Sequence, residues 1–157
     1  MGFLSWLEGT AYSEWIVAGL LGWPLMLSMH AIGLAAVVGI MFAISLRMLG
    51  FFKPIPYAGL SPLLAYAWIG ITVNVFSGLS LFMAQATFYV DSPPFLWKIT
   101  FVILGIANLH VTQRVLRRQA AVWQETGSVS VVGRWLAASS IMFWMLAVIC
   151  GRLIAYL

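Results

Sequence analysis

Long apolar runs alternate with short polar breaks along the chain, and this pattern predicts four membrane-spanning helices. The runs lie near residues 24–46, 63–89, 95–112 and 135–156, and each approaches the ~20 apolar residues that a helix needs to cross a bilayer. Turn-forming residues separate them, including Gly50 with two following prolines, Asp91-Ser-Pro-Pro94 and Gln124-Glu-Thr-Gly-Ser128. We therefore expect residues 1–157 to form a single all-α transmembrane domain.

The segment before the first run has a different pattern. Residues 3–12 mix aromatic residues and leucines with Ser5, Glu8 and Thr10, which is typical of a short amphipathic helix at a membrane interface. The short breaks between the four runs make successive helices antiparallel neighbours. The expected fold is an integral membrane four-helix antiparallel bundle with a short N-terminal interfacial helix.

Small residues indicate which helix faces meet, because helices in lipid associate where backbones approach closely. Residues Ala31, Ala35, Gly39 and Ala43 recur at every fourth position, so we expect this ridge to contact a neighbouring helix. Comparable stripes in the other runs are Gly70, Asn74 and Gly78 with Ser77 beside them; Lys98, Gly105, Asn108 and Thr112; and Ser140, Trp144, Ala147 and Gly151.

Composition excludes a soluble domain and a disordered chain, because 63% of the residues are apolar and only 8% are charged. The single cysteine, Cys150, cannot form an intramolecular disulfide. No phosphate-binding loop, nucleophile triad or zinc motif is present in the sequence, and so little chain lies outside the spans that we do not expect catalysis by this chain alone.

The charged residues predict an orientation. Six of the eight basic residues fall in the breaks after the first and third runs, and the positive-inside rule places these breaks in the cytoplasm. The six are Arg47, Lys53, Arg114, Arg117, Arg118 and Arg134. Both termini then lie on the non-cytoplasmic side. This basic cluster is interpreted as a topology signal that faces anionic lipid, and not as a nucleic-acid interface.

A few polar residues within the spans are the candidate functional groups, since polar side chains are costly in a membrane. His30 has Met26 one turn before it, and Lys98 and Arg152 lie at a comparable depth. A histidine with nearby cations suits haem b, with His30 as the metal ligand and the cations facing the propionates. Soft ligands at Met26, His30 and Met83 would equally suit Cu(I).

His110 is the obvious second haem ligand, but its position is unfavourable. It lies off the small-polar stripe of its helix and about nine residues, or roughly 13 Å, from the depth of His30. The difference in depth shrinks if the first helix begins near Glu14, with Pro24 as an internal kink and Arg47 beyond the membrane. We therefore expect His30 to be the principal residue and keep His110 as a possible partner.

The candidate residues also have a purely structural interpretation. In it, His30 only hydrogen-bonds between helices, Lys98 and Arg152 extend toward the interface, and the methionines fill space. The sequence alone leaves this interpretation open beside the two metal sites.

Four segments resemble an uncharacterised family of four-helix bacterial membrane proteins over about residues 20–118. They are Gly22-Trp-Pro-Leu-Met-Leu-Ser-Met-His30, Ser45-Leu-Arg-Met-Leu-Gly50, Phe76-Ser-Gly-Leu-Ser-Leu-Phe82 and Pro94-Phe-Leu-Trp-Lys98. The resemblance implies a bundle in the bacterial inner membrane but no particular activity. The segment from Trp97-Lys98 to Asn108 is more distantly similar to the membrane domain of CopD-type copper-resistance proteins, which implies copper handling in the cell envelope.

These observations favour a small membrane subunit that binds haem b for electron transfer or anchors a larger membrane complex. Its expected partners are the lipid bilayer and other membrane subunits or further copies of the chain. The alternatives are a copper-handling or small-solute transport protein, and a structural subunit without a cofactor.

Overall fold

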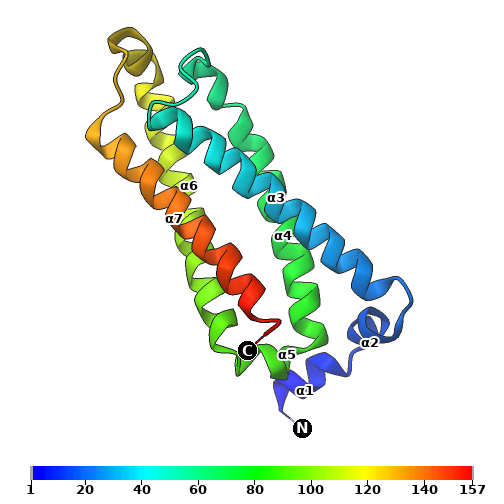
Figure 1. Ribbon diagram of the computed structural model, residues 1–157. Coiled ribbons are helices and arrows are strands. Elements are labelled where there is room, and N and C mark those ends of the chain that lie inside the picture. Colours follow the sequence, from blue (N-terminus) through cyan, green and yellow to red (C-terminus); the bar gives the residue numbers. More distant parts are fainter. Residues whose placement is uncertain (1, 157) are drawn as a thin grey trace.

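The computed structural model describes residues 2–156, and all regular secondary structure in this range is helical (Figure 1). Four long helices are α3 (Gly22–Met48), α4 (Leu63–Ala84), α6 (Pro93–Thr126) and α7 (Val131–Leu153). The short elements are α1 (Phe3–Glu8), α2 (Ala11–Ala18), the 3-10 helix η1 (Tyr57–Leu60) and α5 (Ala86–Val90). All four long helices are sufficiently long and apolar to cross a membrane, so the chain is a multi-pass membrane protein.

Two of the long helices end elsewhere than the apolar runs predicted. The second run is interrupted at Gln85, whose backbone (φ −145°, ψ 47°) is not helical, so its last residues form the separate helix α5. The third helix starts at Pro93, a position where the missing N–H of proline costs no helical hydrogen bond. It continues through the arginines to Thr126 and is ended by Gly127, which adopts the left-handed conformation. Arg, Gln and Ala favour helix, so polarity alone does not end it.

The N-terminal segment forms two short helices where one was expected. α1 ends at Glu8, and α2 begins after Thr10, whose side chain accepts a hydrogen bond from the backbone N–H of Ser13. Both pack against the end of the bundle near the chain termini. A break at residues 19–21 separates α2 from α3, so the first long helix does not extend back to Glu14.

The long helices form two antiparallel pairs. α3 packs along α4 and α6 packs along α7, while α3 also touches α7 between the pairs. In Figure 1 the two pairs lie together at the end that carries η1 and diverge toward the end that carries both termini. This arrangement confirms the all-α four-helix bundle.

Two apolar clusters stabilise the bundle at different levels. The larger one includes Val37, Met41, Ile71 and Trp144 and lies toward the η1 end, whereas the smaller consists of Ile16, Met26, Leu81 and Ala84. On both α3 and α4 a polar layer separates the clusters, because His30 lies between Met26 and Val37, and Asn74 lies between Ile71 and Leu81.

The prediction that the alanine-rich ridge on α3 contacts a neighbouring helix is wrong. Ala31, Ala35, Gly39 and Ala43 are all exposed, and a Cβ added to Gly39 would meet no atom within 4 Å. The neighbouring face, which begins at Gly33, packs on α4 instead. The stripes of the other three helices do face inward: Gly70, Asn74 and Ser77; Gly105, Asn108 and Thr112; and Ser140, Trp144 and Ala147 are all buried.

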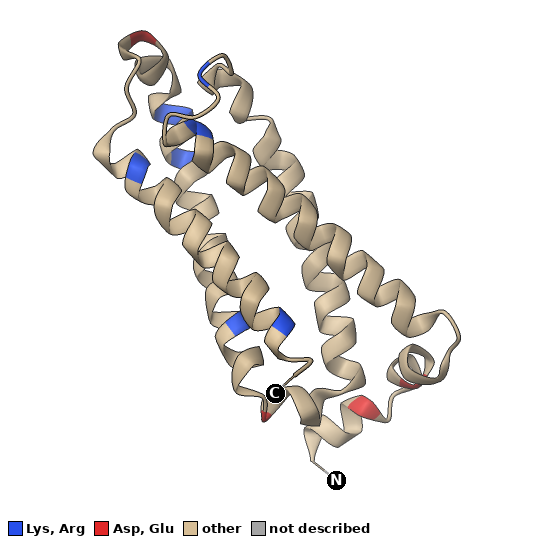
Figure 2. Cartoon of the chain, viewed as in Figure 1, with Lys and Arg blue, Asp and Glu red and all other residues tan. Residues whose placement is uncertain are grey.

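The charges are distributed as the topology argument requires. Figure 2 shows most Lys and Arg residues together at the η1 end, whereas Lys98 and Arg152 lie in the half near the termini. Three of the four acidic residues, Glu8, Glu14 and Asp91, belong to that second half. The two ends of the bundle are therefore electrically different, as the positive-inside rule expects of a membrane protein.

Candidate functional site

His30 is held by α4 through both its backbone and its ring. Its Nδ1 lies 3.1 Å from the backbone oxygen of Asn74 and 3.3 Å from the hydroxyl of Ser77. The Asn74 side-chain amide in turn donates to the backbone oxygen of His30 at 2.8 Å. A carbonyl oxygen can only accept, so Nδ1 carries a proton and donates it. The ring orientation and tautomer of His30 are thus fixed by α4.

Lys98 reaches the other ring nitrogen from α6. Its Nζ lies 3.2 Å from His30 Nε2, a contact that joins the two helix pairs within the polar layer. An ammonium has donors only, so Nε2 must accept and the imidazole is neutral. The structure therefore brings together two of the predicted site residues, His30 and Lys98, and presents Nε2 as a lone pair toward α6.

Glycines on both sides make room for this pair. A Cβ added to Gly78 would stand 3.0 Å from His30 Cε1, closer than side chains normally approach. A Cβ added to Gly151 would lie 3.5 Å from the Cδ and Cε atoms of Lys98. The His30 ring and the Lys98 stem therefore lie directly against the backbones of α4 and α7.

The other predicted site residues lie apart from this contact. Met26 is buried in the smaller apolar cluster, and its sulfur faces the Tyr12 hydroxyl at 3.9 Å. Met83 is half-buried, and its backbone oxygen accepts from the Ser13 hydroxyl. Arg152 is exposed in the last turn of α7, next to the glycine that contacts Lys98.

His110 does not share the level of His30. It lies twelve residues beyond Lys98 on α6, which is about 18 Å along the helix axis. Its side chain is exposed, whereas the neighbouring Asn108 faces α7 and donates to the Leu136 backbone oxygen and the Ser139 hydroxyl. A flat ligand held at His30 cannot also reach His110.

Sequence reasoning missed the residues that orient His30. The sequence pattern predicts only helix contact for Asn74 and Ser77, and the same role for Gly78 and Gly151. A signal was available, because a polar pair one turn apart on an apolar helix must find partners within the membrane. Which helix supplied those partners depended on the packing face of α3, which the alanine ridge had misplaced.

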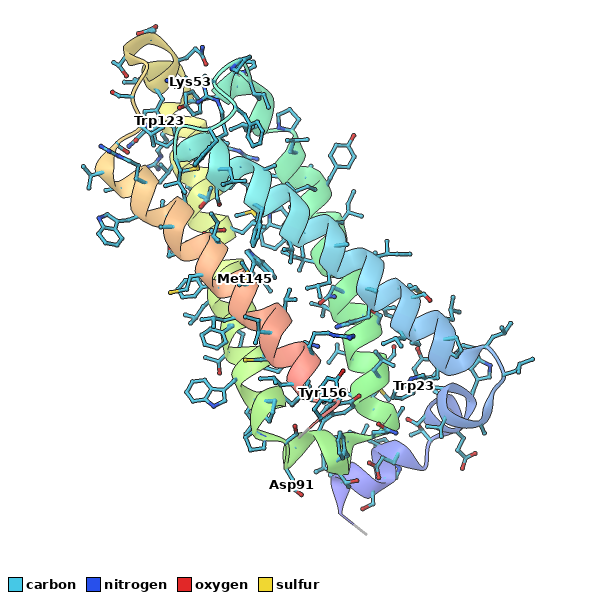
Figure 3. The ribbon with its side chains drawn as sticks, in the orientation of Figure 1. Trp23, Lys53, Asp91, Trp123, Met145 and Tyr156 are labelled. Atoms are coloured by element: carbon cyan, nitrogen blue, oxygen red, sulfur yellow. The ribbon has the colours of Figure 1, made fainter. Side chains whose placement is uncertain are left out.

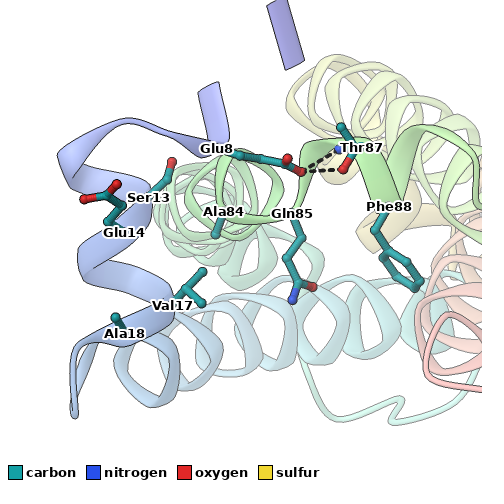
Figure 4. Close-up of a pocket in the computed structure, with 9 residues that line it drawn as sticks. All are labelled: Glu8, Ser13, Glu14, Val17, Ala18, Ala84, Gln85, Thr87 and Phe88. Atoms are coloured by element: carbon teal, nitrogen blue, oxygen red, sulfur yellow. Dashed lines mark hydrogen bonds between the residues drawn. The ribbon is translucent and has the colours of Figure 1, made fainter. Parts of the chain in front are cut away.

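A separate cavity of about 770 Å³ opens at the end near the termini (Figure 4). Its lining combines the acidic residues Glu8 and Glu14 with apolar residues such as Val17 and Ala84. One oxygen of Glu8 accepts from the backbone N–H of Thr87 at 2.8 Å and from its hydroxyl at 2.7 Å. These bonds hold the pKa of Glu8 below its usual value, and they fasten α1 to α5.

Comparisons of the chain with protein-family models, with curated proteins and with solved structures found no match.

Proposed function

We propose that the chain is a small integral membrane subunit that binds haem b through His30, either for electron transfer or as the anchor of a larger complex. The hydrogen bond from His30 Nδ1 to the Asn74 carbonyl is the observation that supports this most. Histidines that bind metals commonly donate their second ring nitrogen to a backbone carbonyl, which fixes the tautomer and makes the free nitrogen a better ligand. His30 has this arrangement, with Nδ1 donating to the Asn74 carbonyl and Nε2 facing α6.

The donor set favours haem over a bare metal ion. Within residues 2–156 there is no group of three or more His, Cys, Asp or Glu side chains that could hold a metal. Haem needs only one or two axial ligands from the protein, so His30 alone suffices. A copper site would require Met26 beside His30, but the Met26 sulfur faces α2 through Tyr12.

Lys98 would supply the partner of a propionate. The four acidic residues of the chain lie outside the membrane-spanning parts of the long helices, and the hydrogen-bond partner of the Lys98 ammonium is a neutral imidazole. A half-buried cation without an anion within the membrane is costly, and a carboxylate would offset that cost. If Lys98 turns from Nε2 to a carboxylate, the same movement frees the nitrogen that would bind iron.

Bound haem b supplies a reversible one-electron carrier. The protein residues would orient it: Asn74 and Ser77 hold the imidazole, and Lys98 and Arg152 at the same end of α6 and α7 would attract its acidic edge. We further propose a bacterial inner membrane location, which the family resemblance implies. By the positive-inside rule, the η1 end would lie in the cytoplasm and both termini outside. Other subunits or further copies would complete the electron path.

The test is an optical spectrum of the detergent-purified protein after reconstitution with haem. We expect a reduced α band in the wild type, its loss in His30→Ala and its retention in His110→Ala. A normal spectrum in His30→Ala would reject the site, and equal loss in both variants would reject His30 as the sole ligand. Binding of Cu(I), but not haem, that is lost in Met26→Ala would replace the proposal with copper handling.

A further inference from the structure

A second, smaller cavity lies at the opposite, basic end of the bundle. Its volume is about 260 Å³, and it is enclosed by the end of α3, the connection to η1 and the end of α6. Arg47 and Lys53 line it together with Tyr57, Trp123 and Gln124. Figure 3 shows Lys53 and Trp123 at this end, far from Asp91 and Tyr156 at the other. The haem proposal makes no use of this cavity.

Arg47 is a buried cation in the wall of this cavity, with only 6% of its surface exposed. Its Nε donates to the Ile55 backbone oxygen at 2.6 Å, and its Nη1 donates to the Tyr57 hydroxyl at 2.8 Å. The guanidinium also stacks over the Tyr57 ring, 3.8 Å from the centroid. These bonds use two of the five N–H donors of a guanidinium. The others remain for a further acceptor.

No acidic side chain lines the cavity within the described part of the chain. Glu125, the acidic residue nearest in sequence, is exposed. The side-chain oxygen of Gln124 accepts from the backbone N–H of Tyr57 at 3.1 Å, which leaves the side-chain NH₂ group of Gln124 as a donor. The polar groups left over are thus donors from Arg47, Lys53 and Gln124. No anion balances these donors, and the buried charge of Arg47 is costly without one.

Two glycines in the lining leave space beside the cavity. Gly50 and Gly127 both belong to its lining and have positive φ values of 103° and 66°. A Cβ at either position would meet nothing within 4 Å. The two glycines allow the tight turns after α3 and α6, and they also leave space beside Arg47. The cavity lies at the helix ends, where lipid headgroups meet a membrane protein.

We propose that this cavity binds the phosphate group of an anionic phospholipid. The guanidinium fork matches two phosphate oxygens, and Lys53 adds a second positive charge. The volume has room for a phosphate and part of its glycerol, since one water occupies about 30 Å³. Arg117 and Arg118 at the same end add a field that attracts anionic lipid. Free phosphate has the same oxyanion chemistry and is the alternative source.

The test measures binding of dioctanoyl phosphatidylglycerol to the full chain in neutral detergent, by native mass spectrometry and by the shift in thermal midpoint. Dioctanoyl phosphatidylcholine and inorganic phosphate are the comparison ligands. We expect the anionic lipid to bind and to raise the midpoint, and the zwitterionic lipid to do neither. Lys53→Gln should weaken binding about fivefold, the effect expected of one basic residue near an anionic headgroup.

Arg134→Gln is the matched control, because Arg134 is an exposed arginine at the same end that does not line the cavity. It should bind as the wild type does, whereas Arg47→Lys should lose most of the affinity because it lacks the fork. Lys53→Gln keeps the test valid if Arg47→Lys fails to fold. Equal losses in Lys53→Gln and Arg134→Gln, or equal binding of both lipids, would overturn the proposal. Saturable binding of inorganic phosphate alone would overturn the lipid as the source.

Discussion

Gly33 on α3 and Gly70 on α4 face each other where the two helices cross. A Cβ on Gly33 would stand 2.8 Å from the backbone oxygen of Gly70, and one on Gly70 would stand 3.0 Å from that of Gly33. Asn74 lies one turn further along α4, so this close approach sets the distance at which its amide reaches His30. The crossing therefore determines the geometry of the polar layer.

Substitution of Gly70 should separate these helices. We expect Gly70→Leu to lower the free energy of unfolding by about 2 kcal/mol or more, since a side chain cannot enter a backbone contact without moving it. The matched control is Gly39→Leu, which places the same side chain on an open face and should cost little. Unfolding of both variants in mixed detergent with SDS measures the difference. Equal destabilisation would mean that the exposed face of α3 also packs.

Substitutions of Lys98 and Asn74 should have opposite effects on the stability of the protein without cofactor. Lys98→Met removes a half-buried cation whose hydrogen-bond partner is a neutral imidazole, so we expect stability to rise by about 1 kcal/mol although His30 loses a donor. Asn74→Ala removes the bond to the His30 backbone and should cost about 1–2 kcal/mol. Thermal unfolding in detergent compares them. A strongly destabilised Lys98→Met would mean that the ammonium is stabilised by an anion in the purified protein.

Acid should release α1 from α5. Side-chain and then backbone hydrogen bonds from Thr87 depress the pKa of Glu8 in the folded chain. The contact is therefore fully present above the ordinary carboxyl pKa and is lost as pH falls through the depressed value. Amide hydrogen exchange at Thr87, compared between neutral and acidic pH after correction for the intrinsic rate, measures it. Protection should fall in acid in the wild type and in Glu14→Gln, but not in Glu8→Gln.

The proposed orientation can be tested by fusions at the C-terminus. We expect alkaline phosphatase, which needs an oxidising compartment, to be active there, and green fluorescent protein to be dark when exported through the Sec pathway. Insertion of the same reporters into the turn between α6 and α7 should give the reverse result. Fluorescence of green fluorescent protein at the C-terminus would mean that the bundle has the opposite orientation in the membrane.

The existence of four long helices was predictable because a membrane demands continuous apolar runs, and the basic end was predictable from charge alone. The inward face of α3 was not. Its two sides are nearly equally apolar, so Ala31 and Gly39 offered as good a ridge as Gly33, and only the partner helix distinguishes them. For the same reason, depth suggested that His30 and Lys98 are close, but no pattern indicated that Asn74 orients the ring.

Helix ends were also difficult to predict where polarity and helix preference disagree. The charges at Arg114 and Arg117 mark the edge of the apolar run but not the end of α6, since both residues are good helix formers. No residue type near Gln85 indicates a helix end, although the backbone leaves helical geometry there.

The length of α6 carries this helix beyond the hydrocarbon layer of a bilayer. Its 34 residues make a rod of about 51 Å, against a hydrocarbon layer of ~30 Å. With Lys98 near one interface, most of the surplus projects at the basic end, where Trp123 packs edge-on against Tyr57 at 5.7 Å between ring centroids. The aromatic pair is buried there, so the fold remains packed beyond the apolar layer, and the cavity that Trp123 lines lies at the level of the headgroups.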